Sequence, residues 1–114
     1  MCTQQEAIGI LREVVEKSSA VLPVQDAFLY GSYARGDFGE DSDVDIFLTT
    51  PLSRQEAEKK RWEISGVASD ISLAHDVVVS ICVRNAQDFQ PEHNPYHCNV
   101  FREGIRYPAG GALS

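Results

Sequence analysis

The chain has 114 residues, enough for one domain with a single hydrophobic core and too few for two. Its formal net charge of −7 argues against proteins that bind nucleic acid broadly through a basic face. Three cysteines without a disulfide-like spacing, no signal-peptide pattern and no apolar run of membrane-spanning length favour a cytoplasmic protein with no membrane association.

A helix and a strand are predicted first. Thr3 and Glu6 have the spacing of a capping box, and apolar residues follow them at helical intervals, so we expect an amphipathic helix to about residue 19. The apolar run at residues 26–30 is short and stops at Gly31, which is typical of a buried strand.

A short helix and a second strand come next. Ser32 is a favourable N-cap for a helix that ends near Phe38. Residues 43–49 alternate acidic and apolar at their start. We therefore expect a strand with Asp43 and Asp45 on one face and apolar side chains on the other.

A long helix and a third strand follow. Residues 53–73 begin with a second capping box and carry an inward apolar stripe, with Trp62 packed at its margin. Residues 76–83 form the clearest strand pattern, and residues 96–107 indicate a short helix or strand.

This order of elements predicts an α/β (α+β) protein in which helices flank a small mixed β-sheet with some parallel pairing. We expect one domain over residues 1–107 and a flexible C-terminal tail over residues 108–114.

Acidic residues crowd the stretch that ends at Asp45. Two residues apart on a strand, Asp43 and Asp45 would leave the same face about 6–7 Å apart and repel each other, which a divalent cation would relieve. Gly31 and Ser32 would let a phosphate approach the backbone, and Arg35 could contact that phosphate or pair with an acidic loop residue. The pattern predicts phosphoryl or nucleotidyl transfer, and a solvated acidic turn is the alternative.

The stretch G-S-x-A-R-G, five further residues and S-D-x-D-hydrophobic resembles the signature of the polymerase-β-like nucleotidyltransferase superfamily. It is most similar to the minimal nucleotidyltransferases (MNT), which include antitoxins paired with HEPN-domain toxins. The fixed positions are all met, at Gly31, Ser32, Ala34, Arg35, Gly36, Ser42, Asp43, Asp45 and Ile46. The resemblance implies the polymerase-β-like fold, two Mg²⁺ ions with Mn²⁺ as a substitute, and transfer of a nucleoside monophosphate, AMP from ATP by default. It assigns nucleotide binding to Gly31, Ser32 and Arg35.

The resemblance also implies a third carboxylate on the strand that follows the long helix. Asp76 matches by position, so the implied catalytic and metal-binding residues are Asp43, Asp45 and Asp76. Asp70 and Asp88 are alternative positions for the third carboxylate.

The chain leaves no room for the additional domain with which larger relatives hold their acceptor. By resemblance, a HEPN-type toxin would present the acceptor hydroxyl, and the chain would act as its antitoxin. A non-catalytic binding module that neutralises such a partner by complex formation is the alternative, and a drug-modifying enzyme that acts alone is disfavoured. Tyr33 could either stack on a nucleotide base or pack over the short helix.

Overall fold

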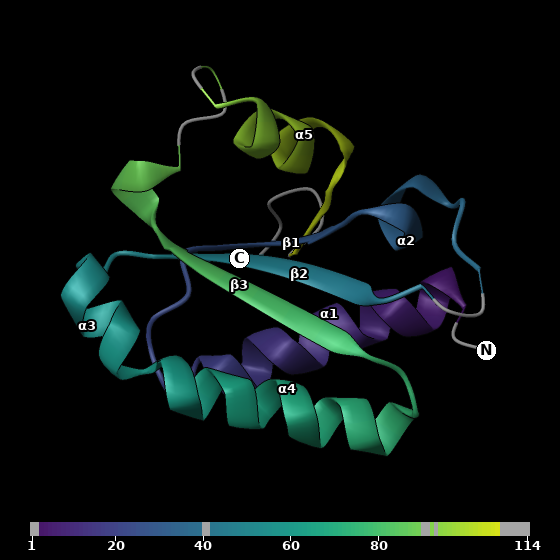
Figure 1. The fold of residues 1–114 in the computed structure, drawn as a ribbon, viewed down its shortest axis with the longest axis horizontal. Helices are drawn as coiled ribbons and strands as arrows, with labels where there is room; N and C mark the ends of the chain where they lie inside the picture. The colour runs from purple at the N-terminus through teal and green to yellow at the C-terminus, as the bar shows by residue number, and fades with distance from the viewer. Residues whose placement is uncertain (1–2, 40–41, 90–91, 93, 108–114) are drawn as a thin grey trace.

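The computed structural model describes residues 3–39, 42–89, 92 and 94–107, and shows helices on both sides of one sheet (Figure 1). In chain order the elements are α1 (Gln4–Ser18), β1 (Asp26–Tyr30), α2 (Ser32–Arg35), β2 (Val44–Thr50), α3 (Arg54–Lys59), α4 (Arg61–His75), β3 (Val79–Asn85), the 3₁₀ turn η1 (Ala86–Asp88), α5 (Pro95–Glu103) and β4 (Ile105–Tyr107). The predicted tail at residues 108–114 lies outside the described residues. None of the described helices has the length and apolar character needed to cross a membrane.

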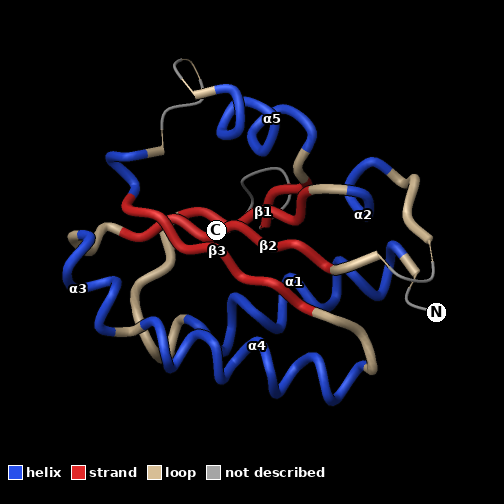
Figure 2. The backbone as a smooth tube through the Cα atoms, in the orientation of Figure 1, coloured by secondary structure: helices blue, strands red, loops and turns tan. Residues whose placement is uncertain are grey.

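The sheet contains four strands in the order β3-β2-β1-β4 (Figure 2). β1 pairs antiparallel with both β2 and β4, whereas β2 and β3 run parallel. The parallel pair is connected through α3 and α4, because a crossover between parallel strands needs a long connection. The predicted small mixed sheet flanked by helices is confirmed.

The larger part of the core lies between the sheet and the helices α1 and α4. Ile10 and Leu11 of α1 and Ile71 of α4 are buried together with Ile46 and Leu48 of β2. The alternation of side chains along a strand places the other residues of β2 on the opposite face. Because Ile46 and Leu48 of β2 are buried in this core, Asp45 must point from the opposite face of the sheet.

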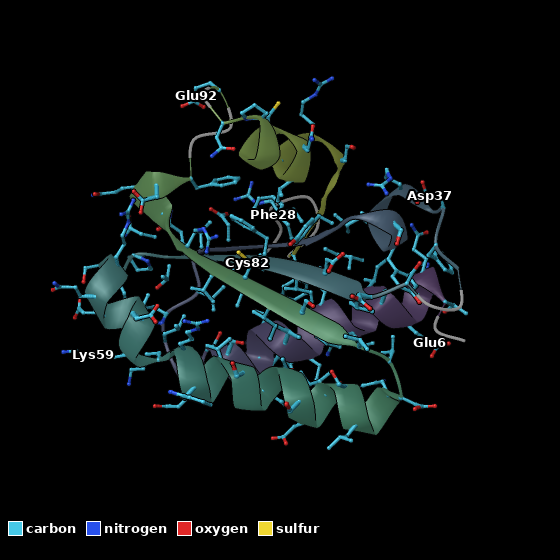
Figure 3. All side chains as sticks on the ribbon, viewed as in Figure 1. Glu6, Phe28, Asp37, Lys59, Cys82 and Glu92 are labelled. Atoms are coloured by element: carbon cyan, nitrogen blue, oxygen red, sulfur yellow. The ribbon has the colours of Figure 1, made fainter. Side chains whose placement is uncertain are left out.

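A smaller aromatic cluster lies on the opposite face, under α5. Phe28, Phe47 and Val100 are buried there, and Phe89 packs against them with its ring centroid 5.4 Å from that of Phe47. Phe28 lies between the sheet and α5 (Figure 3). This cluster occupies the face of β2 that also carries Asp45, two residues before Phe47.

The predicted long helix is two helices, α3 and α4, with a break at Lys60. The capping box of Ser53 and Glu56 is confirmed at the start of α3. At Lys60 the backbone amide turns to the Ala57 carbonyl, 3.0 Å away, and no glycine or proline marks the break. The packing expected for Trp62 is wrong, since its side chain is 87% exposed.

The third strand begins at Val79, three residues later than predicted. Asp76 instead ends α4 in the left-handed conformation, with φ of 53°, and its amide donates to the Ser72 carbonyl. The Ser72 hydroxyl accepts a 3.0 Å hydrogen bond from the Val79 amide and so ties the start of β3 to α4. Residues 76–78 have the composition of a strand, but Asp76 caps α4 and β3 begins only at Val79.

Candidate functional site

The turn after β1 packs directly against Asp45. Tyr30, the last residue of β1, is the register partner of Asp45 in β2, and Gly31 follows it with φ of 76° and ψ of −153°. This backbone region is essentially restricted to glycine. A Cβ atom added at Gly31 would lie 2.8 Å from the Asp45 Oδ2 atom. The Gly-Ser turn therefore faces Asp45, and the absence of a side chain at Gly31 allows its backbone to lie close to the carboxylate.

The short helix α2 begins with Ser32, and its N-cap is Gly31. The prediction that Ser32 caps the helix is thus wrong by one residue, and the Ser32 hydroxyl takes no part in the cap. Intrahelical hydrogen bonding starts at the Ala34 amide, which donates to the Gly31 carbonyl at 3.1 Å, so the Ser32 amide precedes the bonded turn. Gly36 ends α2 in the left-handed conformation, with φ of 88°.

Tyr33 anchors α2 in the core. Its side chain is 1% exposed and stacks on Phe38, with ring centroids 4.4 Å apart and planes 17° apart. The Gln4 side-chain amide of α1 donates a 2.9 Å hydrogen bond to the Tyr33 carbonyl. These contacts assign Tyr33 to packing over the short helix and hold the Gly-Ser turn in place.

The two aspartates of β2 differ in their surroundings. Asp43 is exposed just before the strand, whereas Asp45 is half-buried between the fully buried Val44 and Ile46. Burial raises the pKa of Asp45 above its ordinary value, and the nearby Asp43 carboxylate raises it further. A positive charge placed between these carboxylates would relieve both effects. Their oxygens are also the ligands that hard cations such as Mg²⁺ prefer, so this pair fits a divalent cation.

Arg35 pairs with Asp37, with its Nε atom 3.2 Å from the Asp37 Oδ2 atom. Both side chains are about half exposed or more, and pairs of this kind contribute at most about 1 kcal/mol. Two partners were predicted for Arg35, a phosphate or an acidic loop residue. The structure shows the pair with the acidic loop residue, Asp37. Because this ion pair is weak, Arg35 would lose little free energy on leaving Asp37 for a phosphate.

The three candidates for the third carboxylate lie in different parts of the structure. Asp76 lies in the C-cap of α4, outside β3. Of the two alternatives, Asp88 pairs with an arginine of α3, and Asp70 is exposed on α4. Across residues 3–39, 42–89, 92 and 94–107, no three His, Cys, Asp or Glu side chains group closely enough to hold a metal ion. The structure thus brings Asp43 and Asp45 together, and among the residues that it describes no third acidic side chain joins them.

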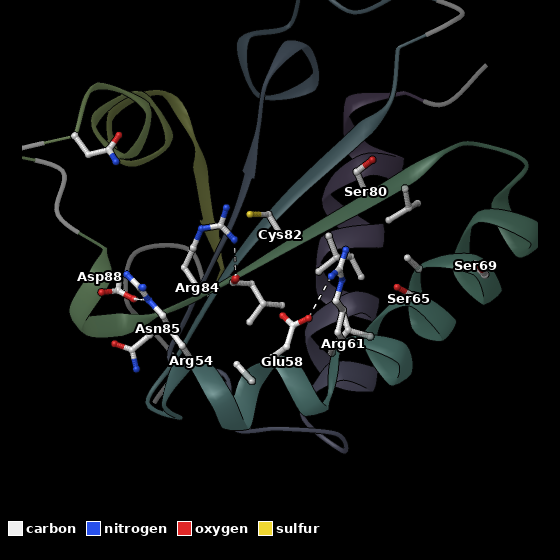
Figure 4. Close-up of a pocket in the computed structure, with 17 residues that line it drawn as sticks. Arg54, Glu58, Arg61, Ser65, Ser69, Ser80, Cys82, Arg84, Asn85 and Asp88 are labelled. Carbon is white, nitrogen blue, oxygen red and sulfur yellow. Dashed lines mark hydrogen bonds and ion pairs between the residues drawn. The ribbon is translucent and has the colours of Figure 1, made fainter.

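A groove of about 1130 Å³ follows β3, between this strand and the helices α3 and α4 (Figure 4). Ser80, the register partner of Asp45, lines it toward the start of β3. Arg84 lines it further along the strand, opposite Arg54 of α3 and Arg61 of α4. The sequence analysis did not single out Ser80, because only the parallel register of β2 and β3 places it beside Asp45.

Comparison with known proteins agrees with this geometry. Residues 8–107 match the family model described as nucleotidyltransferase domain. The chain is 35% identical over 77 residues to MJ0141 of Methanocaldococcus jannaschii, whose name provisionally assigns it to the protein adenylyltransferases; the match covers 66% of this chain and 76% of that protein. MJ0604 of the same organism, named in the same way, is 29% identical over 82 residues, which cover 71% of this chain and 75% of that protein.

Solved structures share the fold. A protein of Sulfolobus solfataricus, described provisionally as a nucleotidyltransferase, superposes with a TM-score of 0.59 at 19% identity, covering 91% of this chain and 81% of the other. A toxin–antitoxin solved with AMP-PNP gives a TM-score of 0.52 at 24% identity, covering 90% and 70% of the two chains.

The family match, the curated relatives and the fold all point to one class. The chain belongs to the nucleotidyltransferase domain family. Within the polymerase-β-like superfamily it is a minimal nucleotidyltransferase, and the predicted enzyme class is confirmed.

Proposed function

We propose that this nucleotidyltransferase moves AMP from ATP to a hydroxyl group of a partner protein, in a reaction that depends on Mg²⁺. The observation that carries the proposal is the close approach of the Gly31 backbone to the Asp45 carboxylate, which leaves no room for a Cβ atom at Gly31. The Gly31-Ser32 turn is suited to phosphate, and the Asp43-Asp45 pair is suited to a cation. A phosphate site next to a cation site is the arrangement that nucleotidyl transfer needs. The names of the two curated relatives support a protein as the acceptor.

Each residue of the site has a role in this proposal. Asp43 and Asp45 hold the cation, which when bound neutralises phosphate charge. The Gly31 backbone and the Ser32 amide and hydroxyl contact the phosphates, and Arg35 leaves its weak ion pair to join them. The acceptor oxygen forms a bond to the α-phosphorus, the bond to the β-phosphate breaks, and pyrophosphate leaves.

The proton of the acceptor hydroxyl must go to a base. The resemblance gives this task to a third carboxylate, and Asp76 remains our prediction for it. The prediction is checked with Asp76→Asn, because asparagine also tolerates the left-handed conformation and the change removes only the charge. A loss of transfer at unchanged stability would support it.

The proposed partner is a HEPN-type toxin, with this chain as its antitoxin in a reducing cytoplasm. Support comes from the fold, which this chain shares with two crystal structures of mutants of the toxin–antitoxin MntA-HpeT, at TM-scores of 0.51 and 0.52.

A non-catalytic module that neutralises the partner by binding is the second candidate function. It is favoured by one observation, namely that among the described residues no group of three acidic side chains forms at the site. The two functions differ in what Asp43→Asn and Asp45→Asn do to toxin neutralisation. Unchanged neutralisation by both variants would support the binding module, whereas loss of neutralisation with an intact complex would support catalysis.

The proposed activity is tested by label transfer. Purified protein, Mg²⁺ and each α-³²P nucleoside triphosphate are incubated with host lysate as the acceptor source, and Asp45→Asn serves as the control. We expect a labelled protein band with ATP that the variant does not produce. Label only in RNA or in a small molecule would refute the protein acceptor, and no label dependent on Asp45 would refute the activity.

A further inference from the structure

The side chains that β3 brings to the aspartate pair are neutral. Asp45 and Ser80 are register partners in the parallel pair, so they project from the same face of the sheet. The Val44 amide donates a 2.8 Å hydrogen bond to the Val78 carbonyl, and the register continued back by one residue sets Val78 beside Asp43. Neighbouring strands lie about 4.8 Å apart. The Ser80 hydroxyl of β3 and the isopropyl group of Val78, the residue before β3, therefore occupy the places from which a third ligand could come.

Three hydrogen bonds to Ser72 hold the segment before β3 at the end of α4, and one of them comes from the Val77 amide, which donates to the Ser72 carbonyl at 3.2 Å. The Asp76 amide donates to the Ser72 carbonyl, and the Val79 amide donates to the Ser72 hydroxyl at 3.0 Å. Asp76 is thereby part of the end of α4. Bringing its carboxylate into the strand position would require the C-cap to unwind.

We infer that Ser80 stands at the third ligand position, and that the site therefore binds a single divalent cation through Asp43 and Asp45. The inference rests on the proposed nucleotidyl-transfer site and deepens it, and it differs from the two ions that the resemblance implies. It has a physical consequence, because the affinity of a hard-cation site depends on how many charged ligands it offers. A carboxylate introduced at Ser80 would complete a set of three and strengthen cation binding.

The inference is tested on the protein without nucleotide, by Mn²⁺ titration with free Mn²⁺ measured by electron paramagnetic resonance. We expect wild type to bind one Mn²⁺ per chain and Asp45→Asn to lose this binding. Ser80→Asp should bind Mn²⁺ at least about tenfold more tightly than wild type, since it adds a charged ligand. Ser80→Asn introduces a side chain of the same shape as aspartate without its charge, and its Mn²⁺ affinity should match that of wild type.

Two further variants separate the local effect from other causes. Gln55→Glu adds the same charge at an exposed position of α3 and should leave Mn²⁺ affinity unchanged. Val78→Asp sets a carboxylate beside Asp43 instead of Asp45, at a side chain that is 58% exposed, and should also tighten binding. This second variant keeps the test decisive if Ser80→Asp unfolds.

Three results would overturn the inference: Mn²⁺ affinities of Ser80→Asp and Val78→Asp equal to wild type, two Mn²⁺ ions bound by the wild-type chain, or a loss of binding in Asp76→Asn as large as in Asp45→Asn. The last would make Asp76 the third ligand. Because the titration needs no turnover, a tighter Ser80→Asp would uphold the site even if label transfer failed. Label transfer with unchanged Mn²⁺ affinities would uphold the function and refute the inference.

Discussion

Replacing Gly31 by alanine perturbs the contact on which the account of the site depends. The backbone at Gly31, with φ of 76° and ψ of −153°, lies in a region essentially restricted to glycine, so any side chain there costs about 1–3 kcal/mol. The added Cβ would also lie 2.8 Å from the Asp45 Oδ2 atom, closer than side-chain carbons approach an oxygen. The Asp45 carboxylate must therefore move, and the cation site with it.

Gly36→Ala is the matched control. Gly36 also has a positive φ, of 88°, but nothing lies within 4 Å of the Cβ that the substitution would add. Left-handed backbone costs a non-glycine residue about 1–2 kcal/mol, so the two variants lose similar amounts of stability. Only Gly31→Ala should also lose nucleotidyl transfer, by at least about tenfold if displacement of the carboxylate costs about 1.4 kcal/mol in the transition state.

Stability is measured by urea unfolding, and transfer by α-³²P label at a temperature where both variants are folded. In thermal unfolding, each kcal/mol of lost stability would lower the Tm by about 4 °C. Equal transfer by Gly31→Ala and wild type would refute the reasoning, because the carboxylate would then tolerate displacement. An equal loss in Gly36→Ala would assign the effect to backbone strain alone.

Three other variants give further predictions. Phe47→Ala empties the centre of the aromatic cluster under α5 and should cost about 3–5 kcal/mol by urea unfolding, with a loss below 1 kcal/mol contradicting the described packing. The folded chain binds the Asp45 proton more tightly than the unfolded chain does, so the ionisation of Asp45 costs folding free energy once the pH rises above its ordinary pKa of 3.8. In metal-free buffer Asp45→Asn should therefore have the higher Tm at pH 7 and lose that advantage as the pH falls below 3.8, and a lower Tm at pH 7 would contradict the burial of Asp45. Asp76→Gly relieves a positive φ and should raise the free energy of unfolding by up to about 1 kcal/mol, whereas a loss would show that the side chain stabilises the cap.

Elements with local signals were predictable from the sequence. The strand at residues 26–30 and both capping boxes agree with the structure, because each depends on residues that are neighbours in the chain. The approach of the Gly-Ser turn to Asp45 was predictable too, since the motif fixes the length of chain between them.

Features that depend on tertiary packing were not predictable. The break at Lys60 has no sequence signal. Trp62 is a large aromatic residue, which favours packing, yet its side chain faces solvent. The start of β3 is decided by how Ser72 caps the end of α4 and binds the strand. Ser80 gains its place in the site only through the register of two strands that are far apart in sequence.

The most direct test of nucleotidyl transfer compares ATP labelled at the α-phosphate with ATP labelled at the γ-phosphate, in parallel reactions with Mg²⁺ and the same acceptor source. The account predicts that α-label enters a protein acceptor, that γ-label appears in pyrophosphate and never in the acceptor, and that Asp45→Asn abolishes the transfer. Transfer of the γ-label would show phosphoryl transfer and contradict the central claim, as would α-label transfer that survives the loss of Asp45.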